Sequence, residues 1–220
     1  MTISRRALCR GAAIGALLAK TDAAFAMLPD DRPYSGATLA RSGNEALDQA
    51  VIIVLMKITS ILGINPGFRF IEDDTSLAIR ESLVPGTRGT VLLGIPLLKR
   101  ALKEFGGGPI VAFICSHECG YIFQFQNGFV ERIDSQNRSR VTGLFADYIA
   151  GYCMGKLQFQ QYSFTAPLAQ FMVDSNNRSN SSLVFQARMV AVEKGFAAAT
   201  LGVPLRDAAN QGFLFANAMN

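Results

Sequence analysis

Apolar residues recur with helical spacing in six stretches of this chain. The clearest stretch begins after Asn44, a residue suited to cap a helix, and ends at Gly63. Its apolar positions are Leu47, Val51, Val54, Leu55, Ile58 and Leu62. The same spacing predicts five later helices, over residues 97–105, 110–125, 141–160, 183–199 and 204–218.

Three short runs between the first two helices have the composition of strands. They are Phe68–Glu72, Ser76–Glu81 and Thr90–Gly94, and Pro85-Gly86 forms a turn before the last of them. Polar loops are expected at residues 131–140 and 175–182. This order of elements, one helix, then a small sheet and then mostly helices, predicts an α+β domain in which several helices pack on a small β-sheet.

The first 26 residues have the pattern of a cleavable signal peptide. A short apolar run, residues 11–19, follows Arg5 and Arg6 and leads to Ala24-Phe25-Ala26. The paired arginines, with Lys20 before the cleavage site, indicate twin-arginine export; an ordinary secretory signal is the alternative. We therefore expect a signal peptide at 1–26, a flexible lead-in at 27–43, a domain at 44–220 and a periplasmic or secreted bacterial protein.

The charge of the chain comes mostly from this leader. The 220 residues carry 21 Lys and Arg against 17 Asp and Glu, and residues 1–26 hold four of the bases and one of the acids. A mature chain with a net charge of +1 gives no support for nucleic-acid binding. No later segment is long and apolar enough to span a membrane, since the best, Val51–Met56, is followed by Lys57.

Candidate chemistry is concentrated around the single histidine, His117, in the segment Cys115-Ser116-His117-Glu118-Cys119-Gly120-Tyr121. On a helix, Glu118 and Tyr121 lie within about 100° of His117, whereas Cys115 and Cys119 face away. A local Cys–His nucleophile is therefore disfavoured. A buried helix with core thiols and a hydrogen-bonded histidine is the plain alternative.

Several surrounding segments extend this pattern. A strand at Thr90–Gly94 and a helix at 97–105 precede the His117 helix, and Gly143 to Gly155 follows as a second motif. Arg188 then precedes Gly195-Phe196. Over residues 67–196 the chain resembles the gluzincin-type zinc metallopeptidases, as a degenerate member with a zincin-like fold.

The resemblance assigns roles residue by residue. In that family the pattern His-Glu-x-x-His is followed by Glu-Leu-x-Ala-Asp. His117 falls on the first zinc ligand and Glu118 on the catalytic glutamate. Tyr121 falls on the second ligand, Gly143 on the third, and Asp147 on an outer-shell aspartate that orients a ligand. Only one of three expected ligands is retained.

The resemblance implies zinc as the cofactor and a peptide as the ligand. His117, Tyr121 and an inward-moving Asp147 are the substitute zinc ligands, with Asp147 remaining in the outer shell as the alternative. Glu118 would be the catalytic base that deprotonates a zinc-bound water. An edge strand of Thr90, Val91, Leu92 and Leu93 would align an extended substrate through main-chain hydrogen bonds.

Three cysteines remain after removal of the leader: Cys115, Cys119 and Cys153. Cys115 and Cys119 pair poorly because they lie four residues apart on one helix. The sequence is consistent with two arrangements of these cysteines. One has a disulfide from Cys153 to Cys115 or Cys119, and the other has three buried thiols.

Two functions follow. The first is an exported pseudo-peptidase that binds a peptide or protein without cutting it. The second is an active zinc-dependent peptidase with unusual ligands. They differ in metal content and in whether Glu118 is needed for hydrolysis.

Overall fold

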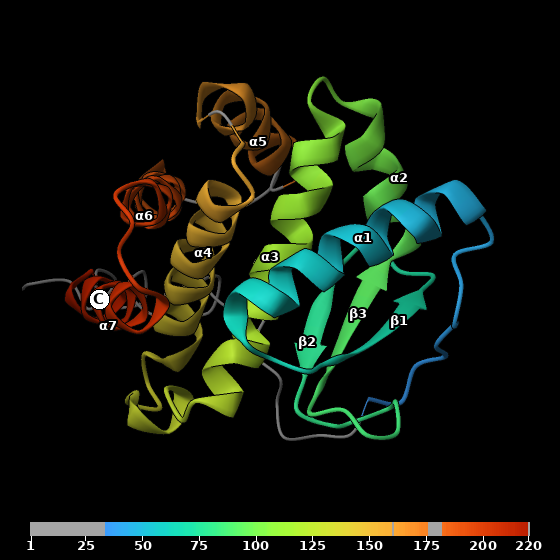
Figure 1. Cartoon of the computed structure of the whole chain (residues 1–220), viewed down its shortest axis with the longest axis horizontal. Helices are drawn as coiled ribbons and strands as arrows, with labels where there is room; N and C mark the ends of the chain where they lie inside the picture. Colours follow the sequence, from blue (N-terminus) through green and yellow to red (C-terminus); the bar gives the residue numbers. More distant parts are fainter. Residues whose placement is uncertain (1–33, 160, 176–181, 220) are drawn as a thin grey trace, which may run out of the picture.

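The computed structural model describes residues 34–159, 161–175 and 182–219 (Figure 1). Within them the chain forms an α+β domain, as predicted. The helices are α1 (Glu45–Leu62), α2 (Ile95–Lys103), α3 (Gly107–Gln126), α4 (Arg138–Lys156), α5 (Gln161–Ser175), α6 (Ser182–Thr200) and α7 (Leu205–Ala218), with a 3₁₀ turn, η1 (Val130–Arg132). The strands are β1 (Gly67–Ile71), β2 (Leu77–Ile79) and β3 (Thr90–Gly94).

Helix α1 begins and ends where the sequence predicts. The Asn44 side chain accepts a hydrogen bond from the Leu47 backbone N–H, and Gly63 ends the helix with φ +62 in the left-handed region. The inward face includes Val51, Leu55 and Ile58, which are fully buried. This amphipathic helix packs against α3.

The sheet has the order β1-β3-β2, and this overturns one prediction about the site. β3 pairs in parallel with β1 and antiparallel with β2, so it is the central strand and not an edge strand. Its residues Thr90, Val91, Leu92 and Leu93 are fully buried. They cannot align a substrate by main-chain hydrogen bonds, because both edges of β3 are already occupied.

The two faces of the sheet bury different residues, as the alternation of a strand requires. Phe70, Val91 and Leu93 join the main core beneath the helices, whereas Ile71, Ile79 and Leu92 form a small separate cluster. The β1 edge is met by the segment before α1. Leu39 and Phe70 form one antiparallel bridge, with both N–H to O distances at 2.8 Å. This part of the lead-in, expected to be flexible, is therefore paired to the sheet.

The signal peptide predicted at 1–26 lies outside the described residues, as do residues 27–33 of the lead-in and most of the loop at 175–182. No helix in the described ranges is long and apolar enough to cross a membrane.

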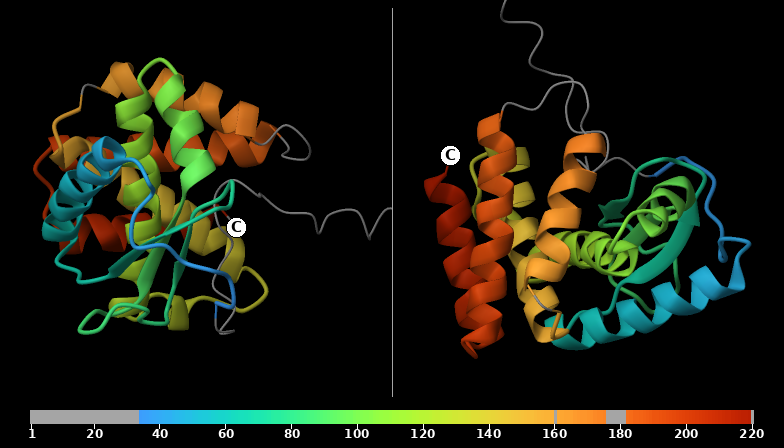
Figure 2. Two further views of the ribbon diagram at one scale, coloured as in Figure 1. Left: turned by 90° about the vertical axis from the view of Figure 1, so that its right-hand side faces the viewer. Right: turned by 90° about the horizontal axis from the view of Figure 1, so that it is seen from above.

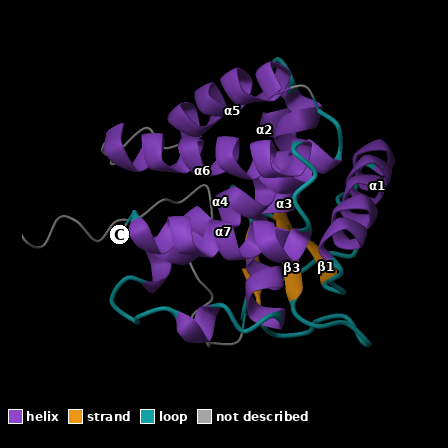
Figure 3. Cartoon of the chain, turned by 60° about the vertical axis from the view of Figure 1, so that its left-hand side comes forward, coloured by secondary structure: helices purple, strands orange, loops and turns teal. Residues whose placement is uncertain are grey.

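Helices α4, α6 and α7 pack together on the side of α3 away from α1 (Figures 2 and 3). Glycines permit the closest approach. A Cβ at Gly151 of α4 would overlap the Val192 carbonyl oxygen, and one at Gly195 of α6 would overlap the Tyr148 carbonyl oxygen. Gly151 and Gly195 therefore serve close packing of α4 and α6.

Helix α5 was not predicted. It contains Pro167, a residue that normally breaks a helix. The preceding helix was predicted to end at residue 160. Instead, α4 ends at Lys156, and Gln158 adopts a left-handed conformation with φ 61 before α5 begins.

Candidate functional site

A close crossing of α3 and α4 creates the polar centre of the protein. At the crossing, Gly120 faces Ala146, where an added Cβ would lie 3.2 Å from the Ala146 Cα and carbonyl oxygen. Two small residues let the helix backbones approach. This approach brings His117, one turn before Gly120, against Asp147.

His117, Asp147 and Arg188 form a buried charged network that joins α3, α4 and α6. The His117 Nδ1 lies 2.9 Å from Asp147 Oδ1. Arg188 donates from Nε to Oδ2 at 2.7 Å and from Nη2 to Oδ1 at 3.0 Å, a bidentate pair. Both carboxylate oxygens of Asp147 are therefore engaged, and the aspartate fixes the orientation of the imidazole ring.

The protonation states in this network follow from burial and charge. Burial lowers the pKa of His117 despite the opposing effect of Asp147, so the imidazole is neutral at pH 7. Burial by itself would raise the pKa of Asp147, but Arg188 and His117 outweigh that effect and the net shift is downward. The result is one buried carboxylate paired with one buried guanidinium, and a neutral imidazole whose Nδ1 lies beside the carboxylate.

Glu118 lies next to this network but does not join it. The side chain is fully buried, and neither carboxyl oxygen has a hydrogen-bond partner among the described residues. Burial raises the pKa of Glu118 to about 8, with Arg188 opposing the shift and Asp147 adding to it. At neutral pH the carboxyl is therefore mostly protonated, whereas a general base must be ionised to accept a proton.

The other two positions that the resemblance assigns to zinc ligands also lie here. The Tyr121 ring packs edge-on against the His117 ring, with 5.1 Å between centroids. A Cβ at Gly143 would lie 3.5 Å from the Tyr121 hydroxyl oxygen. Residues 117, 121 and 143 therefore converge, and Tyr121 extends toward the space that a side chain at 143 would enter.

The donors at this centre do not fit a catalytic zinc ion, which takes three protein ligands and a water. Both Asp147 oxygens are held by His117 and Arg188, and Gly143 supplies no side chain. The described ranges contain no cluster of three His, Cys, Asp or Glu that could hold a metal ion. Asp147 contacts the imidazole of His117, and the donors that remain for a zinc ion are His117 and Tyr121.

The three cysteines are buried thiols. Cys115, Cys119 and Cys153 are all free, so the disulfide from Cys153 that the sequence allowed does not form. Burial, together with the charge of Glu118, raises the pKa of Cys115 to about 12, and the pKa of Cys119 is raised as well. Such thiols are unreactive core residues. Three buried thiols were the other arrangement that the sequence allowed.

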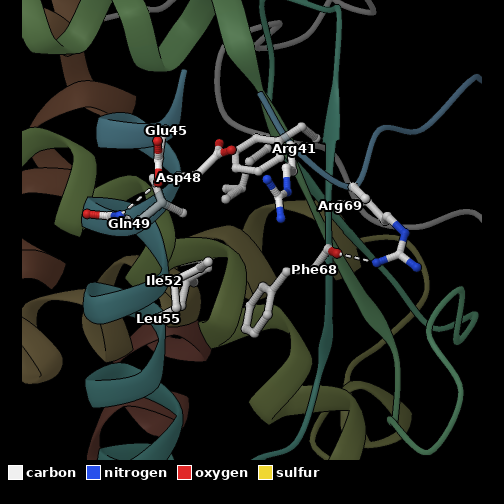
Figure 4. A pocket seen from close by; sticks show the side chains of 12 residues that line it. Arg41, Glu45, Asp48, Gln49, Ile52, Leu55, Phe68 and Arg69 are labelled. Carbon is white, nitrogen blue, oxygen red and sulfur yellow. Dashed lines mark hydrogen bonds between the residues drawn. The ribbon is translucent and has the colours of Figure 1, made fainter. Parts of the chain in front are cut away.

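A second candidate site, which the sequence did not predict, is a groove of about 360 Å³ between α1 and β1 (Figure 4). Ile52 and Leu55 point from α1 toward Phe68 of β1, and Arg41 extends into the same space. These residues come from three separate segments. The one sequence signal was the apolar Ile52, which interrupts the polar face of an amphipathic helix.

Comparisons with protein-family models, with curated protein sequences and with solved structures found no match to this chain.

Proposed function

We propose that this chain is a peptide- or protein-binding pseudo-peptidase, which has the layout of a gluzincin-type zinc metallopeptidase but does not hydrolyse its ligand. One observation carries the proposal: the four positions to which the resemblance assigns zinc-site roles, 117, 121, 143 and 147, lie close together, and two of them hold tyrosine and glycine. The contact between Asp147 and His117 supports the proposal, because the resemblance implies an aspartate at 147 that orients a histidine.

The chemistry of the centre supports a loss of hydrolysis. Peptide hydrolysis at neutral pH needs an activated water and a base to take its proton. Glu118 is buried and mostly protonated, and Asp147 is held by Arg188. The network of His117, Asp147 and Arg188 instead ties together three helices, which is a structural role.

Export by the twin-arginine route is part of the proposal. The pattern of Arg5-Arg6, a short apolar run and Ala24-Phe25-Ala26 supports it. A folded domain with three unpaired thiols also suits a route that carries proteins already folded. Replacement of Arg5 and Arg6 by lysine, followed by assay of periplasmic and cytoplasmic fractions, tests the route: retention in the cytoplasm is expected, and unchanged export would contradict it.

The second candidate, a zinc-dependent peptidase, rests on Glu118. A buried carboxyl without a described hydrogen-bond partner is costly for a purely structural role and is a common feature of functional sites. The experiment is hydrolysis of a mixed peptide library with 10 μM zinc present, followed by mass spectrometry, for the parent chain and Glu118→Gln. We expect no cleavage by either protein. Cleavage that Glu118→Gln abolishes would contradict the proposal and establish the peptidase.

A further inference from the structure

Helix α6 exposes a regular row of apolar side chains. Leu183, Val190 and Ala197 recur at intervals of seven residues. Leu201, directly after the helix, continues its last turn by donating its backbone N–H to the Ala197 carbonyl oxygen at 3.0 Å. Leu183, Val190 and Leu201 are 73%, 38% and 81% exposed, and Ala197 is exposed as well. A seven-residue repeat stays on one face of a helix, so these four residues form one apolar stripe, which we call the α6 stripe.

The α6 stripe faces away from the rest of the protein. Helix α6 lies on the side of α4 away from the sheet, at the edge of the molecule (Figure 1). Its residues Val192 and Gly195 approach the backbone of α4. At about 3.6 residues per turn, the stripe lies on the opposite side of α6 from these two residues. The stripe is therefore open to a partner along the 19 residues of the helix, a length of about 28 Å.

Two opposite charges flank the middle of the stripe. Glu193 and Lys194 are exposed, and no charged residue lies three or four positions before or after either of them. Neighbours in sequence on a helix do not face each other, so the two charges do not pair within one chain. Neither forms an ion pair with a residue of 34–159, 161–175 or 182–219. The Lys194 ammonium lies 5.6 Å from the centre of the Phe215 ring, a contact that does not neutralise its charge.

A second copy of the chain fits this surface when the two α6 helices run antiparallel about a two-fold axis. If Glu193 of one copy faces Lys194 of the other, the axis generates the reverse pair as well. Val190 lies three residues before Glu193, and Ala197 lies three residues after Lys194. The same register therefore places the larger Val190 opposite the smaller Ala197 of the second copy.

This register also covers the ends of the stripe. Leu183 lies ten residues before Glu193, and the exposed Pro204 lies ten residues after Lys194. Leu183 of one copy therefore meets Pro204 of the other, one turn from the exposed Leu201. A single surface thus supplies the acid and the base, and the apolar side chains, that its own copy needs.

We propose that the α6 stripe is the interface of a homodimer in which two α6 helices pack antiparallel. Charge complementarity selects a second copy, because one acid and one base flank each stripe and the two-fold axis makes two ion pairs of them. One helix pair of this length is smaller than a standard interface, so we expect a Kd of about 10–100 μM. The dimer does not depend on whether the chain hydrolyses peptides.

Sedimentation velocity of the full chain from about 5 to 500 μM measures this association. The parent chain should change from monomer to dimer over this range. Glu193→Lys alone and Lys194→Glu alone place like charges opposite each other, so each should weaken self-association at least about tenfold. The double variant Glu193→Lys, Lys194→Glu restores two opposite pairs and should dimerise like the parent. The control is Glu104→Lys, a charge reversal at an exposed position at the end of α2, which should leave the dimer unchanged.

An equimolar mixture of the two single variants gives the sharpest result. Each variant carries charges of one sign beside the stripe, so the mixture should form a heterodimer with two opposite pairs. Val190→Asp should abolish association of the parent. A parent chain that stays monomeric at about 500 μM would overturn the proposal, and so would a dimer that persists unchanged in Val190→Asp and in both single variants. The substituted side chains are all exposed, and circular dichroism checks that each variant folds.

Discussion

Replacement of Glu118 by glutamine should make the protein more stable, and increasingly so as the pH rises. The carboxyl has a pKa of about 8 in the folded chain and 4.5 as its ordinary value, so the folded state binds the proton more tightly than the unfolded state. Stability is therefore lost as the pH rises from 4.5 to 8. Glutamine has nearly the same shape and no charge, and it removes this loss.

The magnitude follows from the two pKa values. Each pH unit between them costs at most about 1.4 kcal/mol of the free energy of unfolding. Between pH 5 and pH 7.5 the accumulated loss is about 3 kcal/mol. His117, Asp147 and Arg188 are present in both proteins, so their own pH dependence largely cancels in the difference.

Urea unfolding followed by far-ultraviolet circular dichroism suits this chain, which has no tryptophan. The measurement is made at both pH values with EDTA present. The stability difference between Glu118→Gln and the parent should grow by about 3 kcal/mol between pH 5 and pH 7.5. The exposed Glu104→Gln is the control and should show no such growth. A difference that is constant with pH would refute the buried, protonated state of Glu118.

Three further predictions concern the helices and the polar centre. Gly151→Ala should destabilise the folded protein by about 3 kcal/mol or more, because the added Cβ would overlap the backbone of α6. Gly108→Ala, which has open space around it, is the control and should be neutral or stabilising. Thermal unfolding compares the two variants. Asp147→Asn should cost about 3–5 kcal/mol in urea unfolding, because it leaves the buried arginine charge uncompensated, and a loss under 1 kcal/mol would contradict the network. The double variant Tyr121→His, Gly143→Glu should bind about one zinc per chain by isothermal titration, since Tyr121 packs against the imidazole and Gly143 faces the Tyr121 hydroxyl; either single variant should bind much more weakly.

Local chemistry made some elements predictable from the sequence. The bounds of β3 were predicted correctly, and α1 was recognised from its cap at Asn44 and its end at Gly63. In both cases a turn or capping residue marks the end of a clear pattern. Helix α5 has no such marks, and it contains Pro167, a residue that disfavours a helix.

Long-range arrangement was harder to predict. Hydrophobic alternation identifies a strand but does not say where the strand lies in the sheet, so β3 was assigned to an edge and is in fact central. The sequence related Asp147 to a histidine only through the resemblance, and it gave no reason to pair Asp147 with Arg188, 41 residues later. The groove around Arg41 depends on three segments that only the fold brings together.

Zinc content is the decisive measurement for the proposed loss of the metal site. The full chain is expressed and purified without chelators or a histidine tag, and its zinc is measured by mass spectrometry. We expect less than about 0.1 zinc per chain, because His117 and Tyr121 are the donors left at the centre. About one zinc per folded chain, lost in His117→Ala, would contradict this expectation and establish a rebuilt metal site.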